Sequence, residues 1–100
     1  MISASGDYGK PRPGVVVQSD SIATDSVLVA QITSEIVDAP LYRLTVEPTE
    51  ANGLVKPSQV MVDKIVTMRR SKCGPVRGRL DDAALLALGQ MLAVVLGLAG

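Results

Sequence analysis

The segment GDYGKPRPGVVVQSD, from Gly6 to Asp20, joins a charged stretch rich in glycine and proline directly to a run of valines. The run Pro13–Gln18 is rich in β-branched residues, which favours a β-strand. Proline restricts its own φ and biases the preceding residue toward extended conformations, so Arg12, between two prolines, has few backbone choices. An arginine held in this way can direct its guanidinium group at a fixed point. The segment therefore predicts a first core strand with a preoriented arginine beside it.

Further strand-like segments follow at regular intervals and are separated by turn residues. The expected strands are Ser26–Thr33, Leu41–Val46, Ser58–Asp63 and Lys64–Met68 (as one or two strands), and Val76–Leu80. The expected connections are Ser19–Asp25, as a loop or a single helical turn, the turn cluster Glu47–Gly53, and a turn at Cys73–Pro75. Strands spaced in this way predict a small, curved antiparallel sheet or barrel.

The end of the chain has a different pattern. Ala83–Gly100 carries no charge and is rich in leucine and alanine, which predicts a helix with Asp81 or Asp82 as its N-cap. Such a helix would be about 27 Å long, close to the thickness of a bilayer core. Because Gln90 and three glycines make it only mildly apolar, we expect no membrane anchor. We expect a helix that packs on the sheet and takes part in a subunit interface.

Length and composition limit the possible chemistry. One hundred residues predict a single domain over residues 1–100, and a content of 47% apolar but 2% aromatic residues predicts a core of Val, Leu, Ile, Ala and Met. The single cysteine, Cys73, excludes an internal disulfide, and the absence of histidine excludes an imidazole base and a His-ligated metal. Catalysis must therefore use Arg, Lys, carboxylates or hydroxyls. Met1–Ser5 lacks the features of a signal peptide, so a cytoplasmic protein is expected.

The net charge is zero, but the basic residues are unevenly distributed. Six of the ten lie in a stretch without any acid: Lys64, Arg69, Arg70, Lys72, Arg77 and Arg79. Such a block predicts one positive face that suits phosphate groups. From charge alone, a solvated loop and strand face is an equally good interpretation.

Three sequence blocks in this order resemble the MazF/PemK family of toxin endoribonucleases. They are GDYGKPRPGVVVQSD, then VLVAQITSE (Val27–Glu35), then GLVKPSQVMVDKIVTM (Gly53–Met68), and together they cover residues 6–68. The resemblance implies an SH3-like barrel, a homodimer and a cognate antitoxin that blocks the site. It also implies sequence-specific cleavage of single-stranded mRNA by 2′-OH attack on the scissile phosphate, with no metal and no cofactor.

The resemblance also assigns roles to particular residues. Arg12 would stabilise charge on the scissile phosphate, because a guanidinium binds phosphate bidentately and stays charged. Thr33 would donate its hydroxyl to the same phosphate, and Asp7, in a mobile loop, would accept the 2′-OH proton. Asp63 is a possible additional acid, although Met61 stands where such members carry an arginine. The expected RNA-binding residues are Lys10, Ser34, Lys64, Arg69, Arg70 and Lys72.

The chain also departs from the family pattern. Members usually begin with a strand opened by a basic-Gly-Asp sequence, whereas here only Met1–Ser5 precede Gly6, so a shortened N-terminal strand is expected. Two other functions stay open. A gyrase-poisoning toxin has the same fold, but its helix ends in Trp-Gly-Ile, whereas this chain ends in Gly-Leu-Ala-Gly. An inactive relative that only binds the antitoxin is the second.

Overall fold

A computed structural model of the chain describes residues 2–7 and 10–98, with side chains described for residues 13–98. The described part contains one sheet with the strand order β4-β5-β3-β2-β1-β6, and every pair of neighbours is antiparallel. The strands are β1 Ile2–Asp7, β2 Lys10–Val16, β3 Ser26–Thr33, β4 Arg43–Val46, β5 Ser58–Arg69 and β6 Cys73–Gly78. A 3₁₀ turn, η1 (Arg70–Lys72), joins β5 to β6, and a single helix, α1 (Asp82–Val95), follows.

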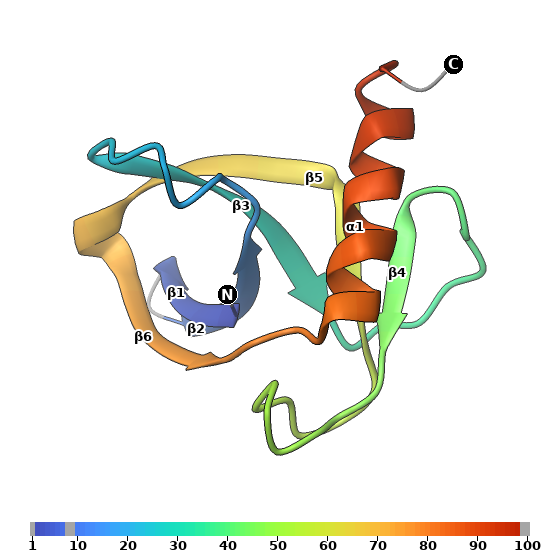
Figure 1. Ribbon diagram of the computed structural model, residues 1–100. Helices are drawn as coiled ribbons and strands as arrows, with labels where there is room; N and C mark the ends of the chain where they lie inside the picture. Colours follow the sequence, from blue (N-terminus) through green and yellow to red (C-terminus); the bar gives the residue numbers. More distant parts are fainter. Residues whose placement is uncertain (1, 8–9, 99–100) are drawn as a thin grey trace.

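The sheet curves strongly, as Figure 1 shows. Strands β6, β1, β2, β3 and β5 surround a common interior, and α1 stands beside β4 and β5. This architecture confirms the expected fold class, which is mainly β with a C-terminal helix. The helix is apolar, but within residues 2–7 and 10–98 no helix has the length and apolar character needed to cross a membrane.

Strand β5 has an irregular stretch in its middle. From Ala30 to Ile32, two residues along β3, the partner on β5 moves from Ile65 to Val60, five residues back. Extra residues on one strand of a pair bend that strand and increase its twist. The sequence left open whether this region forms one or two strands, and the answer is one strand with a bend near the expected boundary.

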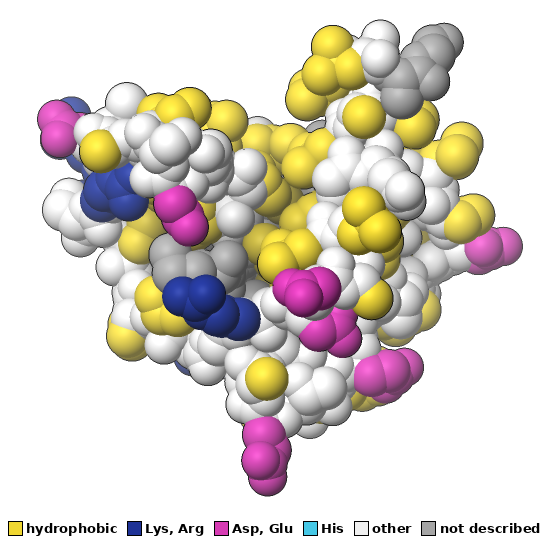
Figure 2. Space-filling model, viewed as in Figure 1, with side chains coloured by type: hydrophobic (Ala, Val, Ile, Leu, Met, Phe, Trp, Pro, Cys, Tyr) yellow, Lys and Arg dark blue, Asp and Glu magenta, His cyan; other side chains and the backbone are white. Residues whose placement is uncertain are grey.

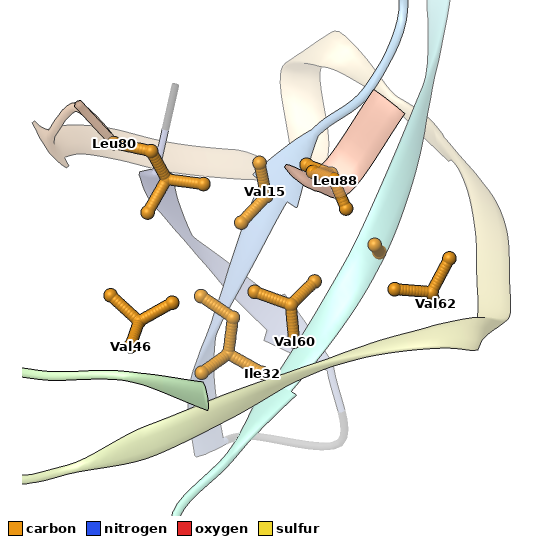
Figure 3. Packing of buried hydrophobic residues seen from close by; sticks show 8 residues of the cluster. Val15, Ile32, Val46, Val60, Val62, Leu80 and Leu88 are labelled. Atoms are coloured by element: carbon orange, nitrogen blue, oxygen red, sulfur yellow. The ribbon is translucent and has the colours of Figure 1, made fainter. Parts of the chain in front are cut away.

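The core is built from aliphatic side chains alone, as the composition predicts. Its buried members come from four strands, the segment after β6, and the helix: Val15, Ala30, Ile32, Val46, Val60, Val62, Leu80 and Leu88. Figure 3 shows these side chains pointing toward one another between the sheet and α1. The interior therefore depends on interlocking branched side chains, whose packing is sensitive to the loss of single methyl groups.

Helix α1 is capped at both ends. The Asp81 carboxylate accepts a hydrogen bond from the Ala84 amide at 2.7 Å, which confirms the expected N-cap. At the other end, Gly97 has φ +74° and Leu98 N–H donates to the Ala93 carbonyl at 2.7 Å, as in a Schellman motif. The helix therefore ends at Val95, whereas the sequence predicted that it continues to residue 100.

The N-terminal region differs from the sequence-based expectation. Strand β1 is present between β2 and β6 and pairs with both of them. The expected loop around Asp7 and Lys10 is strand backbone, with these two residues paired. The glycines and prolines of this segment suggested a loop. However, β2 pairs with β3 only from Gly14 onward, so the prolines before it are not required to donate a hydrogen bond to β3. Consequently β2 starts at Lys10 and ends at Val16, earlier than Pro13–Gln18.

Two shorter predictions are also corrected. Cys73–Pro75 begin strand β6 instead of forming a turn, and the chain reverses in η1. Because β6 ends the strand order, its proline is tolerated there. Leu41 and Tyr42 form a turn before β4, since the amides of Tyr42 and Arg43 both donate to the Ala39 carbonyl, at 3.2 and 2.8 Å.

Candidate active site

The side of the sheet opposite the aliphatic core carries a row of polar residues. In the registers of β4 with β5 and of β3 with β5, Thr45 and Thr33 both lie opposite Gln59. Directly opposed residues in antiparallel strands share a face, and the neighbouring core residues Val60 and Ile32 point to the other face. Thr45, Gln59 and Thr33 therefore form a continuous line, which we call the polar row.

The register of β2 with β3 points along this line toward Arg12. Gly14 lies opposite Gln31, where the pairing of the two strands begins, and continuing that register by two residues on each strand would lead to Arg12 and Thr33. On its other side, Arg12 pairs with Ser5 of β1. The side chains of Arg12, Asp7 and Lys10 lie outside the described residues, so their placement here refers to the backbone only.

Close packing fixes β2 against β3 beside Arg12. A Cβ atom built on Gly14 would collide with Cγ1 of Val29 and lie 3.3 Å from the carbonyl oxygen of Ala30. Gly14 is therefore required for this close approach, and any side chain would push the two strands apart. The glycine of the Pro-Gly-Val sequence thus allows β2 and β3 to approach closely where their pairing begins.

Thr33 is half-buried at the last position of β3. Its Oγ1 accepts a hydrogen bond from the Glu35 amide at 3.1 Å, which orients the side chain in a tight local turn. A hydroxyl that accepts in this way keeps its own proton free to donate. Ser34, the next residue, is exposed. The geometry therefore gives Thr33 a fixed position and an available donor.

Gln59 organises the polar row and was not identified from the sequence. It is 3% exposed, and its amide makes four hydrogen bonds. Oε1 accepts from Val37 N–H at 3.1 Å and from Arg43 Nη1 at 3.4 Å, while Nε2 donates to the Val37 carbonyl at 2.9 Å and to Thr45 Oγ1 at 3.1 Å. A lone amide between Ser58 and Val60 in an apolar strand was the available signal for this residue.

Asp63 and Lys64 lie apart from the polar row. Both are exposed in the irregular stretch of β5. Along that strand, Asp63 is about 14 Å from Gln59 at the usual rise per residue. The structure therefore does not bring Asp63 together with Thr33 within the described side chains.

The basic turn approaches Arg12 through β1. Arg69 pairs with Ser26, at the end of β3 away from Thr33. However, Cys73, which follows η1, pairs with Ser5, and Ser5 pairs with Arg12. The backbone of Ser5 thus lies between Arg12 and the residue that follows the turn with the expected RNA-binding cations.

The cations of this turn differ in their surroundings. Arg70 donates from Nε to the Thr24 carbonyl at 2.5 Å and from Nη2 to the Ile22 carbonyl at 3.3 Å. These bonds fasten the loop between β2 and β3 to the end of β5. Arg69 and Lys72 are exposed and make no such side-chain bond within the described part of the chain. Arg70 therefore stabilises the loop between β2 and β3 through its side chain, whereas Arg69 and Lys72 make no such hydrogen bond among the described residues.

No cluster suited to a metal ion occurs among the described residues: no three His, Cys, Asp or Glu side chains come together there. The chemistry that the described residues offer consists of a threonine hydroxyl, guanidinium groups and backbone amides. These groups bind and stabilise anions.

The chain is similar in sequence and in fold to known proteins. The chain is 43% identical over 100 residues to a probable endoribonuclease MazF of Mycolicibacterium smegmatis, covering 98% of this chain and 92% of the relative. Its fold is similar to that of the Mycobacterium tuberculosis toxin MazF-mt6, with a TM-score of 0.85 at 24% identity, covering 99% and 98% of the two chains.

A second solved structure is an endoribonuclease in complex with its cognate antitoxin from a mycobacterial species. It has a TM-score of 0.85 at 20% identity, covering 99% of this chain and 93% of that chain. The sequence pattern of the PemK-like, MazF-like toxins matches residues 2–96. The chain therefore belongs to the PemK-like, MazF-like family of toxins of type II toxin–antitoxin systems.

Proposed function

We propose that this chain is a toxin endoribonuclease that cuts single-stranded mRNA at a short sequence, in the cytoplasm, as a single domain over residues 1–100. Membership of the family and the relative named as a probable endoribonuclease support this proposal. The observation that supports the site assignment is that Gly14, two residues after Arg12, pairs with Gln31, two residues before Thr33. A gyrase-poisoning function is not supported, since the named relatives are endoribonucleases and MazF toxins.

The proposed reaction uses the RNA's own nucleophile. The 2′-oxygen attacks the neighbouring phosphorus and forms a new P–O bond, while the bond from phosphorus to the 5′-oxygen breaks. The products are a 2′,3′-cyclic phosphate and a 5′-OH end, whose oxygen takes a proton from water as its bond to phosphorus breaks. Arg12 stabilises the charge that develops on the phosphate oxygens, and the Thr33 hydroxyl donates to the same group. Asp7 accepts the 2′-OH proton, and no metal or cofactor takes part.

Other residues bind the RNA backbone in this proposal. The expected contacts come from Lys10, Ser34, Lys64, Arg69, Arg70 and Lys72. Among these, Arg69 and Lys72 have exposed side chains next to Cys73, which pairs with Ser5, the partner of Arg12. Contacts of this kind weaken as the salt concentration rises, because phosphate binding releases condensed counterions.

We further propose that the toxin is a homodimer that a cognate antitoxin neutralises. Figure 2 shows apolar side chains gathered over α1 and a hollow beside it. Leu86 and Val94 on this helix are 65% and 51% exposed. Exposed apolar patches of this kind mark interaction surfaces. A structural neighbour is an endoribonuclease in complex with its antitoxin, which supports an antitoxin partner for this chain.

One experiment tests the function directly. The purified chain is incubated with long single-stranded RNA in EDTA, and the 5′-OH ends are sequenced. We expect discrete cuts at one short motif, which would establish the activity, its sequence specificity and its independence of metal together. Intact RNA from a folded protein that still binds its antitoxin would instead identify an inactive, antitoxin-binding relative.

A further inference from the structure

Arg43, the first residue of β4, has an unusual environment for an arginine. Its side chain is half-buried, and its only hydrogen bond within the described residues runs from Nη1 to Gln59 Oε1 at 3.4 Å. The Nε atom is buried, and no group of the described part of the chain accepts a hydrogen bond from it. An unsatisfied buried donor is costly, so such a group in a folded protein calls for an explanation, such as a bound water or ion or a functional role.

The position of Arg43 connects it to the polar row. Gln59 accepts the one hydrogen bond that the Arg43 side chain makes within the described residues, and it lies directly opposite Thr33 in the sheet. Arg43 itself pairs with Met61, two residues along β5 from Gln59. From the usual strand spacing and rise, the Cα atoms of Arg43 and Thr33 are about 12 Å apart on the same face of the sheet. A long arginine side chain covers much of that distance.

The chemistry of the guanidinium suggests its ligand. With Nη1 directed at Gln59, the edge formed by the Nε–H and Nη2–H groups is left to bind something else. This edge matches two oxygens of one phosphate, and arginine binds phosphate in this bidentate way. A hydrogen bond of 3.4 Å is weak, so the side chain can turn away from Gln59 and expose Nε to an arriving phosphate.

We propose that Arg43 binds an RNA phosphate adjacent to the scissile one and acts as a positioning residue. The inference rests on the proposed nuclease function, in which Arg12 and Thr33 hold the scissile phosphate. Since a single strand carries a phosphate at every nucleotide, a second cation on the same face fixes the direction of the strand through the site. The hydrogen bond to Gln59 orients the Arg43 side chain while no RNA is bound.

The test compares Arg43→Met with Arg43→Lys. Methionine keeps an unbranched apolar side chain and removes the charge. Lysine keeps the charge but lacks the planar guanidinium that binds two phosphate oxygens at once. The control, Lys56→Met, removes one exposed charge from the loop between β4 and β5. Cleavage kinetics are measured on an oligonucleotide that contains the mapped cut site. Binding is measured as a function of salt on the same oligonucleotide carrying 2′-O-methyl groups, which cannot be cut.

For Arg43→Met we expect KM to rise about tenfold with kcat changed less than about twofold, as for an interaction made equally in the ground and transition states. The slope of log affinity against log salt should become shallower by about 0.7, which corresponds to one phosphate contact on a single strand. Arg43→Lys should restore the slope and part of the KM. Lys56→Met should match the wild type in KM and in slope.

Two results would overturn the inference about Arg43 alone. In the first, the wild type cuts RNA and Arg43→Met retains its KM and salt slope. In the second, Arg43→Met lowers the thermal midpoint and reduces activity only in proportion to the unfolded fraction, which indicates a structural role. If the wild type cuts no RNA in EDTA, the proposed function itself fails and this inference falls with it.

Discussion

Gln59 and Thr33 together illustrate how single side chains build the proposed site. Gln59 is buried with every donor and acceptor of its amide in use, and it holds the loop after β3 through Val37. Thr33 begins that loop and keeps a hydroxyl proton available for a substrate. The buried amide therefore supports the position of the reactive hydroxyl without touching the RNA in our proposal.

Substitutions of Thr33 and Arg12 test the catalytic assignment. We expect Thr33→Ala and Arg12→Ala each to lower the single-turnover cleavage rate by about 10²–10³-fold, since each removes one donor to the developing phosphate charge. Thr33→Ser keeps the hydroxyl and should retain most of the rate. Sedimentation should give the same oligomeric state for all three variants. Cleavage by either alanine variant at the wild-type rate would remove that residue from the mechanism.

The Gln59→Leu variant tests the supporting role of the amide. Leucine fills a similar volume but leaves both backbone groups of Val37 without their partner. We expect the free energy of unfolding to fall by about 1–3 kcal/mol, the usual cost of unsatisfied buried polar groups. Urea unfolding followed by circular dichroism measures this change. Thr67→Val, which loses only an exposed hydroxyl on the same strand, is the control and should cost much less.

At the scale of elements, the strand ends and the helix caps place the functional groups. The turn Glu47–Gly53, between β4 and β5, is an example of how such a connection is stabilised. The buried side chain of Asn52 accepts from the amides of Thr49 and Leu54, at 2.9 and 3.0 Å, and donates to the Glu47 carbonyl at 2.8 Å. Gly53 has φ +68° and lies against the Arg77 backbone of β6, so this turn fastens β4 and β5 to the far edge of the sheet.

The helix N-cap gives a prediction at this scale. Asp81→Ala removes the acceptor of the Ala84 amide and should lower the free energy of unfolding by about 1 kcal/mol. Asp82→Ala removes the same charge from the first turn but keeps the cap, so its effect should be smaller. Urea denaturation of both variants gives the comparison. Equal losses would show that charge near the helix end matters more than the capping bond.

The exposed apolar face of α1 matters at the scale of the whole molecule. Leu88 on the inner face of the helix is 3% exposed and packs in the core, whereas Leu86 and Val94 face outward. A helix that is apolar on nearly all sides is typical of one buried on both sides. The homodimer that we propose would cover this outer face.

Leu86→Glu tests the assembly. A charge placed in a buried apolar interface is strongly destabilising, so we expect the protein to become monomeric at micromolar concentration, as measured by analytical ultracentrifugation. Its circular dichroism spectrum should stay unchanged, because the side chain is already largely exposed within one chain. Val55→Glu adds the same charge at a 90% exposed loop position and should leave the assembly intact. A dimeric Leu86→Glu variant would place the interface elsewhere.

The strand Ser26–Thr33, the aliphatic core, the start of the helix and the family could all be predicted from the sequence, because local periodicity, capping chemistry and ordered blocks of residues carry that information. The folded chain was needed to show that Gln59 lies opposite Thr33, that Arg43 donates to Gln59, and that β2 pairs with β3 from Gly14, two residues after Arg12. Their proximity arises from pairing between strands that are distant along the chain, and no local pattern encodes a register. For the same reason the prolines around Arg12 predicted a loop: their place in a strand depends on where β3 stops pairing with β2.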